Sequence, residues 1–218
     1  MKILIDTLDL NEIKKYSELG IISGTTTNPT FSKRFGMKDD LDTIKQVAEA
    51  QDGVGEIYIE AFGDTADEIE DNAWRISEGS DYKDLIFKIP FTEAGVCATS
   101  KLSKSRFRIN LHLVFSLSQS LIAEQVGAEF ICPLIGRMDD DGMSGLEVVR
   151  EIKKSYDTNE VKTKIMGSSI RNMNHVNELI KIGVDYVTIP PKILDKMFYH
   201  KLTDEGFQTF KKDLENIG

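Results

Sequence analysis

Short apolar runs alternate along the chain with longer segments in which apolar residues recur every three to four positions. A run of about four to eight apolar residues between turn signals is typical of a buried strand, and the longer spacing is typical of an amphipathic helix. The pattern predicts eight strands, at residues 2–6, 21–25, 56–61, 85–89, 107–114, 129–132, 163–167 and 186–189. It predicts helices between them, at residues 11–19, 41–50, 66–77, 117–126, 146–155 and 173–182.

Strands that alternate with helices favour an α/β fold with a parallel sheet, and eight such units are the number in a (β/α)8 TIM barrel. A doubly wound sheet is the competing architecture, but it normally has a glycine-rich turn after its first strand. Here the sequence Ile-Asp-Thr-Leu-Asp occupies residues 5–9 instead. Without a linker, repeat or low-complexity tract, residues 1–218 are expected to form a single (β/α)8 barrel domain with short loops.

The ends of several helices are marked by their sequence. Residues 65–68, 116–119 and 144–147 each have the Ser/Thr-x-x-Glu/Gln pattern of a capping box, and glycines at 20, 127 and 183 follow predicted helices. A further amphipathic helix is predicted at about 203–217, with Phe207, Phe210 and Leu214 on one face. This helix is expected either to cap the barrel or to pack on a neighbouring subunit.

Composition and charge narrow the class of protein. The 218 residues carry a net charge of −9 without any basic block, which argues against nucleic acid as a partner. No apolar stretch reaches the roughly 20 residues of a membrane span, and residues 1–6 run into a strand pattern rather than a signal peptide. Cys97 and Cys132 lack zinc-ligand spacing and suit the reducing cytoplasm. The three histidines are too scattered to indicate a metal site.

Lys88 is the most informative residue, because it stands inside the apolar strand 85–89. Lysine is almost never fully buried without a partner. Burial disfavours the ammonium form, so the pKa of Lys88 is expected to fall, and a neutral amine is a nucleophile toward carbonyl carbon. Lys88 is therefore a candidate Schiff-base lysine. The alternatives are a core lysine paired with an acid such as Glu60, or a side chain that extends to solvent at the strand end.

Other polar residues stand at or just after the predicted strand ends, where barrel enzymes keep their chemistry. Each has a plain structural explanation when taken alone, such as helix capping, a turn or a surface ion pair. Their shared position at one end of the barrel is what argues for a site. Two arginines and a serine suit a phosphate group, and an acid with a neutral lysine suits carbonyl chemistry on a sugar phosphate. These residues are Asp6, Thr26, Asn28, Glu60, Asn110, His112, Arg137, Ser169 and Arg171.

The same segments resemble the transaldolase family, specifically its short members, over nearly the whole chain. The matching pieces are Ile-Asp-Thr at 5–7, Thr-Thr-Asn-Pro at 26–29, Lys-Ile-Pro-Phe-Thr at 88–92, Leu-Val-Phe-Ser at 113–116, Gly-Arg-Met-Asp-Asp at 136–140 and Ser-Ile-Arg at 169–171. The resemblance implies a (β/α)8 barrel, sugar phosphate substrates and no metal or organic cofactor. Short relatives form rings of subunits, often decamers, so a homo-oligomer is expected.

The resemblance also implies roles for individual residues. Lys88 looks like the Schiff-base lysine, and Asp6 resembles the acid that handles the sugar hydroxyl proton during carbon–carbon cleavage. Glu60 stands where transaldolases have a glutamate that works through a water and where the related fructose 6-phosphate aldolases have glutamine. The remaining candidates are expected to bind substrate: Asn28 and Asn110 at the dihydroxyacetone unit, Arg137, Ser169 and Arg171 at the phosphate, and Thr26, His112 and Leu134 elsewhere in the site.

Three residues depart from the family pattern. His112 stands where a threonine usually helps to hold the catalytic water, and Cys132 replaces a serine near the substrate. Leu134 replaces the phenylalanine of transaldolases and the tyrosine of the aldolases. Glu60 together with Leu134 favours a transaldolase that moves a dihydroxyacetone unit between fructose 6-phosphate and erythrose 4-phosphate, in the pentose phosphate pathway of the cytoplasm. The alternatives are an aldolase that releases free dihydroxyacetone and a catalytically silent sugar-phosphate-binding protein.

Overall fold

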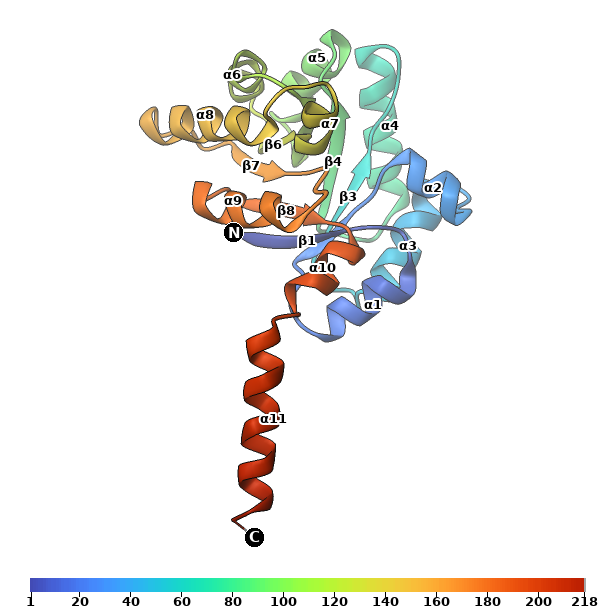
Figure 1. The fold of residues 1–218 in the computed structure, drawn as a ribbon. Helices are drawn as coiled ribbons and strands as arrows, with labels where there is room; N and C mark the ends of the chain where they lie inside the picture. Colours follow the sequence, from blue (N-terminus) through green and yellow to red (C-terminus); the bar gives the residue numbers. More distant parts are fainter. Residues whose placement is uncertain (218) are drawn as a thin grey trace.

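The computed structural model describes residues 1–217, and eight parallel strands within them close into one barrel (Figure 1). Each strand pairs with the next along the chain, and β1 also pairs with β8, so the sheet has no free edge. The predicted (β/α)8 barrel is confirmed, and the doubly wound alternative is wrong. The strands are β1 Lys2–Asp6, β2 Gly24–Thr26, β3 Glu56–Glu60, β4 Leu85–Pro90, β5 Ile109–Val114, β6 Phe130–Pro133, β7 Lys164–Gly167 and β8 Tyr186–Ile189.

Helices surround the barrel and connect successive strands (Figure 1). Four of them were not predicted from the sequence: α2, α5, α7 and α10. Three of these have only six or seven residues, too few to show a helical period. The helices are α1 Leu10–Glu18, α2 Pro29–Phe35, α3 Asp40–Ala50, α4 Ala66–Gly79, α5 Glu93–Leu102, α6 Leu117–Gln125, α7 Ile135–Asp140, α8 Gly145–Thr158, α9 Met173–Ile182, α10 Pro191–Met197 and α11 Lys201–Glu215.

The predicted helix caps form in two cases of three. Thr65 and Glu68 make a complete capping box at α4. Ser116 accepts the amide proton of Gln119 at α6, while the Gln119 side chain accepts from Phe115 instead of closing the box.

The third cap is wrong, because the Ser144 side chain makes no capping hydrogen bond. Asp139 Oδ1 accepts the amide proton of Gly145 in its place, at 3.0 Å. The glycines predicted to end helices all have the positive φ that favours glycine: Gly20, Gly127 and Gly183.

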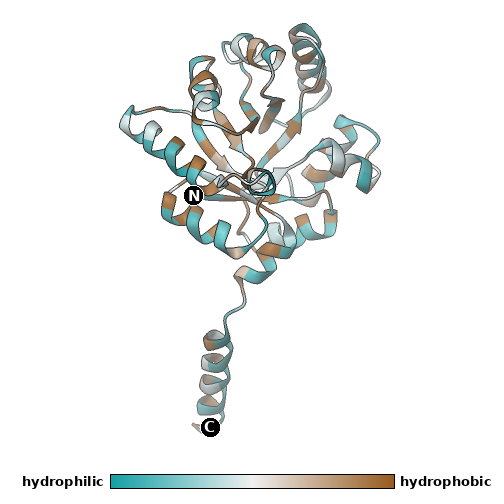
Figure 2. Cartoon of the chain, turned by 45° about the horizontal axis from the view of Figure 1, so that its top comes forward, coloured by the Kyte–Doolittle hydropathy of each residue, from teal (hydrophilic) through white to brown (hydrophobic). Residues whose placement is uncertain are grey.

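The apolar core has two layers, separated by the barrel wall. The larger layer lies between the strands and the surrounding helices, and Figure 2 shows apolar residues on the strands and on the inner faces of the helices. The smaller layer fills the barrel interior and includes Tyr58 and Ile86. Side chains alternate along a strand, so Glu60 and Lys88, each two residues further on, also face the interior. The fold therefore directs both charges into the carboxyl end of the barrel.

The opposite end of the barrel is closed by a network of charges. Arg108 donates to Glu129 at 2.9 and 2.8 Å and to Glu56 at 3.0 Å. The Tyr58 hydroxyl, deep in the interior, donates to Glu56 at 2.9 Å. These groups satisfy one another, so this end of the barrel has a structural role.

Helix α11 points away from the barrel (Figure 1), and no residue of it is buried. Phe207, Phe210 and Leu214 are exposed on one face of this helix. The expectation that α11 caps the barrel is therefore wrong, whereas packing on a neighbouring subunit stays a prediction. None of the helices within residues 1–217 has the length and apolar character needed to cross a bilayer.

Candidate active site

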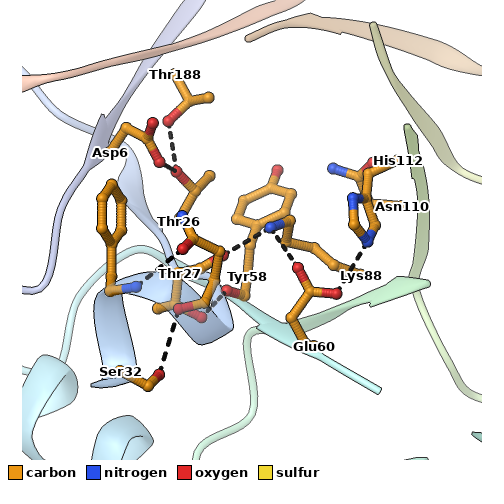
Figure 3. A network of polar contacts seen from close by, with 12 residues as sticks. Asp6, Thr26, Thr27, Ser32, Tyr58, Glu60, Lys88, Asn110, His112 and Thr188 are labelled. Atoms are coloured by element: carbon orange, nitrogen blue, oxygen red, sulfur yellow. Dashed lines mark hydrogen bonds and ion pairs between the residues drawn. The ribbon is translucent and has the colours of Figure 1, made fainter. Parts of the chain in front are cut away.

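Lys88 and Glu60 form a buried ion pair at the carboxyl end of the barrel (Figure 3). The register of β3 and β4 places the two residues opposite each other. Lys88 Nζ donates to Glu60 Oε1 at 2.8 Å and to the carbonyl oxygen of Thr27 at 2.6 Å, and both charged side chains are 9% exposed. A carboxylate in contact with a lysine amine can take the proton that the amine must lose before it attacks a carbonyl.

The expected fall in the pKa of Lys88 is wrong for the resting protein. Burial lowers this pKa, but the Glu60 carboxylate, together with Asp6, outweighs burial and raises it above its ordinary value. Burial likewise raises the pKa of Glu60, and Lys88 and His112 outweigh it and lower that pKa to about 2. The two shifts agree, so the resting site holds an ammonium beside a carboxylate. A nucleophilic attack by Lys88 would therefore require a proton transfer first.

Asp6 lies across the barrel mouth from this pair and is held by Thr26, which in turn bonds Thr188 (Figure 3). Thr26 Oγ1 donates to Asp6 Oδ1 at 2.9 Å and shares a 2.5 Å hydrogen bond with Thr188 Oγ1. Burial raises the pKa of Asp6, against the opposing effects of Lys88 and of the Thr26 hydrogen bond. A buried carboxylate with a raised pKa is suited to accept a proton. Thr188 was missed by the sequence analysis, although it is the polar residue near the end of the last predicted strand.

Asn110 and Asn28 differ in whether the side-chain amide oxygen already has a hydrogen-bond partner within the protein. Asn110 pairs with Lys88 in the register of β4 and β5 and is buried. Its Oδ1 has no hydrogen-bond partner among residues 1–217, and Nδ2 contacts only the Met166 sulfur, at 3.6 Å. Asn28 instead uses its Oδ1 to cap α2, accepting from Phe31 at 2.9 Å. The structural explanation of Asn28 therefore holds for its oxygen, and Asn110 is the amide open to a ligand.

The predicted phosphate-binding residues come together where α7 meets the loop after β7. Gly136 allows this approach, since a Cβ there would lie 2.4 Å from the Ser169 carbonyl oxygen and 2.6 Å from Arg171 Nε. Ser169 has a φ of 57°, a conformation that serine rarely adopts. In this structure the Arg171 guanidinium is held by both Asp140 oxygens, at 2.9 and 2.5 Å. A bidentate pair of this kind has the geometry in which arginine also binds phosphate.

Arg137 is exposed and forms no ion pair within residues 1–217. Its charge lowers the pKa of His112 after the larger effect of burial, so the guanidinium lies near the barrel mouth. Leu134 immediately precedes α7, forms an isolated parallel β-bridge with Ser168 and is largely buried.

His112 and Cys132 are partners in the register of β5 and β6. His112 Nε2 lies 2.9 Å from Glu60 Oε2, and burial raises the pKa of the Cys132 thiol to about 11, so the thiol stays neutral. The structure thus brings together Asp6, Thr26, Glu60, Lys88, Asn110 and His112, with Arg137 on the neighbouring helix α7 and Ser169 and Arg171 in the loop after β7. No group of three or more histidine, cysteine, aspartate or glutamate side chains in residues 1–217 is arranged to hold a metal ion.

Solved structures give a comparison at the level of the fold. A thiamine phosphate pyrophosphorylase from Pyrococcus furiosus superposes with a TM-score of 0.56 at 18% sequence identity, over 87% of this chain and 85% of that one. At this identity the likeness concerns the fold alone.

Sequence comparison is more specific. The family described as Transaldolase/Fructose-6-phosphate aldolase matches residues 3–218. Proteins called probable transaldolase from Brachyspira hyodysenteriae and Streptococcus agalactiae are each 37% identical over 217 residues, covering 100% of this chain and 99% of theirs. One from Brucella anthropi is 36% identical over 218 residues, covering 100% and 98%. With the barrel and the residues at its mouth, these matches establish that the chain belongs to the transaldolase/fructose 6-phosphate aldolase family.

Proposed function

We propose that this protein is a transaldolase that transfers a dihydroxyacetone unit between sugar phosphates through a Schiff base on Lys88. The expected exchange converts fructose 6-phosphate and erythrose 4-phosphate into sedoheptulose 7-phosphate and glyceraldehyde 3-phosphate, in the pentose phosphate pathway. The observation that carries the proposal is the buried Lys88–Glu60 pair with Asp6 facing it. The two free cysteines suit the reducing cytoplasm, where we place the reaction.

The first stage forms the imine. Lys88 gives up a proton toward Glu60 and adds to the C2 carbonyl of the ketose, and the resulting hydroxyl leaves as water. The iminium then withdraws electrons from the adjacent carbon–carbon bond, so one difficult cleavage is divided into easier steps. Glu60 is within 2.8 Å of Lys88 Nζ, close enough to accept and return the proton.

The second stage breaks and remakes the bond between C3 and C4. Asp6 accepts the C4 hydroxyl proton as the aldose phosphate departs, and the three-carbon enamine stays bound to Lys88. The free Oδ1 of Asn110 is available to a hydroxyl of that unit. A second aldose phosphate then enters and the steps run in reverse. A held acceptor reacts at a high effective concentration, which favours transfer.

The phosphate group binds at Arg137, Ser169 and Arg171 in this proposal. Arg171 must first leave Asp140, because the same guanidinium edge now faces that carboxylate. Leu134 presents no hydroxyl near the imine, which supports transfer over release of free dihydroxyacetone. The printed names of the relatives support the same choice.

Reduction of the imine tests the proposal. The protein incubated with fructose 6-phosphate and then treated with borohydride should carry a three-carbon adduct on Lys88, detected by intact mass and peptide mapping. Added erythrose 4-phosphate should discharge the adduct before reduction and yield sedoheptulose 7-phosphate. Free dihydroxyacetone formed at the same rate without an acceptor would indicate the aldolase. A folded protein without any adduct would indicate a silent binding protein.

We further propose that the chain assembles through α11 into a homo-oligomeric ring, such as the decamer that the family resemblance implies. An isolated helix of 15 residues is marginal in water, and its apolar face here contacts no part of its own barrel. Replacing Phe207 and Phe210 with glutamate should convert the assembly into monomers, because the interface loses about 1.5–3 kcal/mol of apolar burial for each phenylalanine side chain removed. Light scattering measures the mass. Gln208→Glu, on the opposite face, should leave the mass unchanged, and a monomeric parent protein would overturn the assembly.

A further inference from the structure

His112 connects directly to the Lys88–Glu60 pair (Figure 3). Glu60 Oε1 lies 2.8 Å from Lys88 Nζ, and Glu60 Oε2 lies 2.9 Å from His112 Nε2, so one carboxylate bridges an amine and an imidazole. The Glu60–His112 contact lacks regular hydrogen-bond geometry, and neither atom has another partner among residues 1–217. At 2.9 Å, no water fits between them. The imidazole itself is the next polar group after Glu60.

The backbone next to His112 is irregular in a way that orients its side chain. The register of β5 and β6 shifts between His112 and Val114, and Leu113 between them has a φ of 60°. A leucine rarely adopts this conformation, which persists only where the surrounding structure imposes it. Bulges occur next to active sites, where they redirect a side chain. The irregularity thus marks His112 as a residue whose direction matters.

Charged and titratable groups face His112 from four elements: Glu60 of β3, Lys88 of β4, Cys132 of β6 and Arg137 of α7. Burial lowers the pKa of His112, Glu60 raises it, and Lys88 and Arg137 lower it further, with a net fall below the ordinary 6.5. The ring is therefore neutral at pH 7 in the resting protein. A neutral imidazole can accept a proton.

We propose that His112 positions Glu60 and stores the proton that Lys88 releases, so that Lys88, Glu60 and His112 act as a proton relay during imine formation. The inference deepens the proposed function and rests on it. It gives the imidazole a role that a water bound beside Glu60 would otherwise have, and it extends the substrate-binding role expected of His112 from the sequence.

The relay balances in atoms and charge. The Lys88 ammonium passes a proton to Glu60 Oε1. The carboxyl group then turns about its Cγ–Cδ bond and passes this proton to His112 Nε2, whose ring carries its hydrogen on Nδ1 at the start. A neutral amine, a carboxylate and an imidazolium remain. The amine adds to the ketone, and its second proton moves to the new alkoxide to form the carbinolamine. The imidazolium proton returns through Glu60 to the carbinolamine hydroxyl, which leaves as water. The products are the iminium, one water and a neutral His112.

The imidazolium is a transient in this scheme, because the resting site favours the proton on Lys88. The relay requires a neutral ring at the start. Imine formation should therefore be fast above the pKa of His112 and should slow as the pH falls through that value, which lies below 6.5.

His112→Gln tests the relay, because glutamine can reach Glu60 with its amide but cannot carry a proton. The rate of adduct formation on Lys88 at pH 7, measured by rapid quenching with borohydride and intact mass, should fall about 10²- to 10³-fold, the range of a lost acid–base group. The acidic limb of the pH profile should disappear. His200→Gln, at the exposed start of α11, makes the same change away from the barrel mouth and should leave rate and profile unchanged.

His112→Ala gives a second readout that does not depend on glutamine packing well. Added imidazole should restore adduct formation in His112→Ala in proportion to its concentration, with the acidic limb of the small molecule's own titration. Circular dichroism and the melting temperature establish that each variant is folded.

The outcomes separate the two proposals. A parent protein that forms no adduct overturns the proposed function. A parent protein that forms the adduct, together with His112→Gln of equal rate and unchanged pH profile, overturns the relay alone. A slow His112→Gln whose acidic limb persists, without rescue of His112→Ala by imidazole, means that His112 is structural and also overturns the relay.

Discussion

Replacing Lys88 with arginine should abolish turnover, with a loss of roughly 10⁴- to 10⁶-fold, comparable to removing the nucleophile of other covalent enzymes. A guanidinium remains protonated at every pH that the protein tolerates, so it cannot become the neutral amine that attacks a ketone. The substitution keeps a positive charge near the buried Glu60, which is why arginine is the appropriate replacement. The measurement is the rate of sedoheptulose 7-phosphate formation, together with a borohydride trap for any adduct.

The control for this experiment concerns stability. A neutral replacement such as Lys88→Met would leave the buried Glu60 carboxylate without its partner and lower the free energy of unfolding by about 3–5 kcal/mol, so lost activity could come from unfolding. Lys83→Arg makes the same chemical change at an exposed position just before β4 and should retain full activity. If Lys88→Arg, shown to be folded by chemical denaturation, still turned over at the parent rate, Lys88 would not be the nucleophile.

Asp6→Asn should slow carbon–carbon cleavage by about 10²- to 10⁴-fold while leaving imine formation detectable. Asparagine is nearly isosteric and can still accept the Thr26 hydrogen bond, but it cannot take up the C4 hydroxyl proton. The uncleaved ketose should then accumulate on Lys88. Borohydride trapping distinguishes the two states by mass, because the variant should carry a six-carbon phosphate adduct where the parent carries three carbons.

Asp9→Asn is the matched control for Asp6. Asp9 caps α1 through the amides of Asn11 and Glu12, and asparagine caps a helix about as well as aspartate. The control variant should therefore behave as the parent. An equal loss of imine formation and cleavage in Asp6→Asn, without a six-carbon adduct, would show that Asp6 holds the site together and does not transfer the proton.

The barrel could be predicted because its strands are continuous apolar runs, and most boundaries agree within two residues. The second strand is the exception, since the run at 21–25 precedes the observed strand Gly24–Thr26. Ile21 and Ile22 pack against the core before β2 begins, so their apolar pattern resembles that of a strand although they lie outside it. Helix α5 escaped prediction because its buried face consists largely of small residues, including Gly95, where a Cβ would lie 2.0 Å from the Pro90 carbonyl oxygen.

The sequence predicts which residues form the candidate site better than it predicts their protonation and ion pairs. Parallel strands place their carboxyl ends together, so polar residues at those ends meet whatever the details of packing. The protonation of Lys88 depends on a 2.8 Å distance to Glu60, and no pattern in the chain specifies that distance. The Arg171–Asp140 pair and the Glu60–His112 contact likewise depend on how α7 and the bulged β5 are oriented.

The charge network around Arg108 has a consequence for altering this protein. The charge network and the candidate active site lie at opposite ends of the barrel. Between them, the barrel interior is filled by aromatic and aliphatic side chains that include Tyr58 and Phe130. If the proposed transfer is right, residues of the mouth can therefore be exchanged to accept other aldehydes without disturbing the Arg108 network at the opposite end. A library of variants for new donors or acceptors should therefore change only residues at the mouth and keep the Arg108 network, which stabilises the fold.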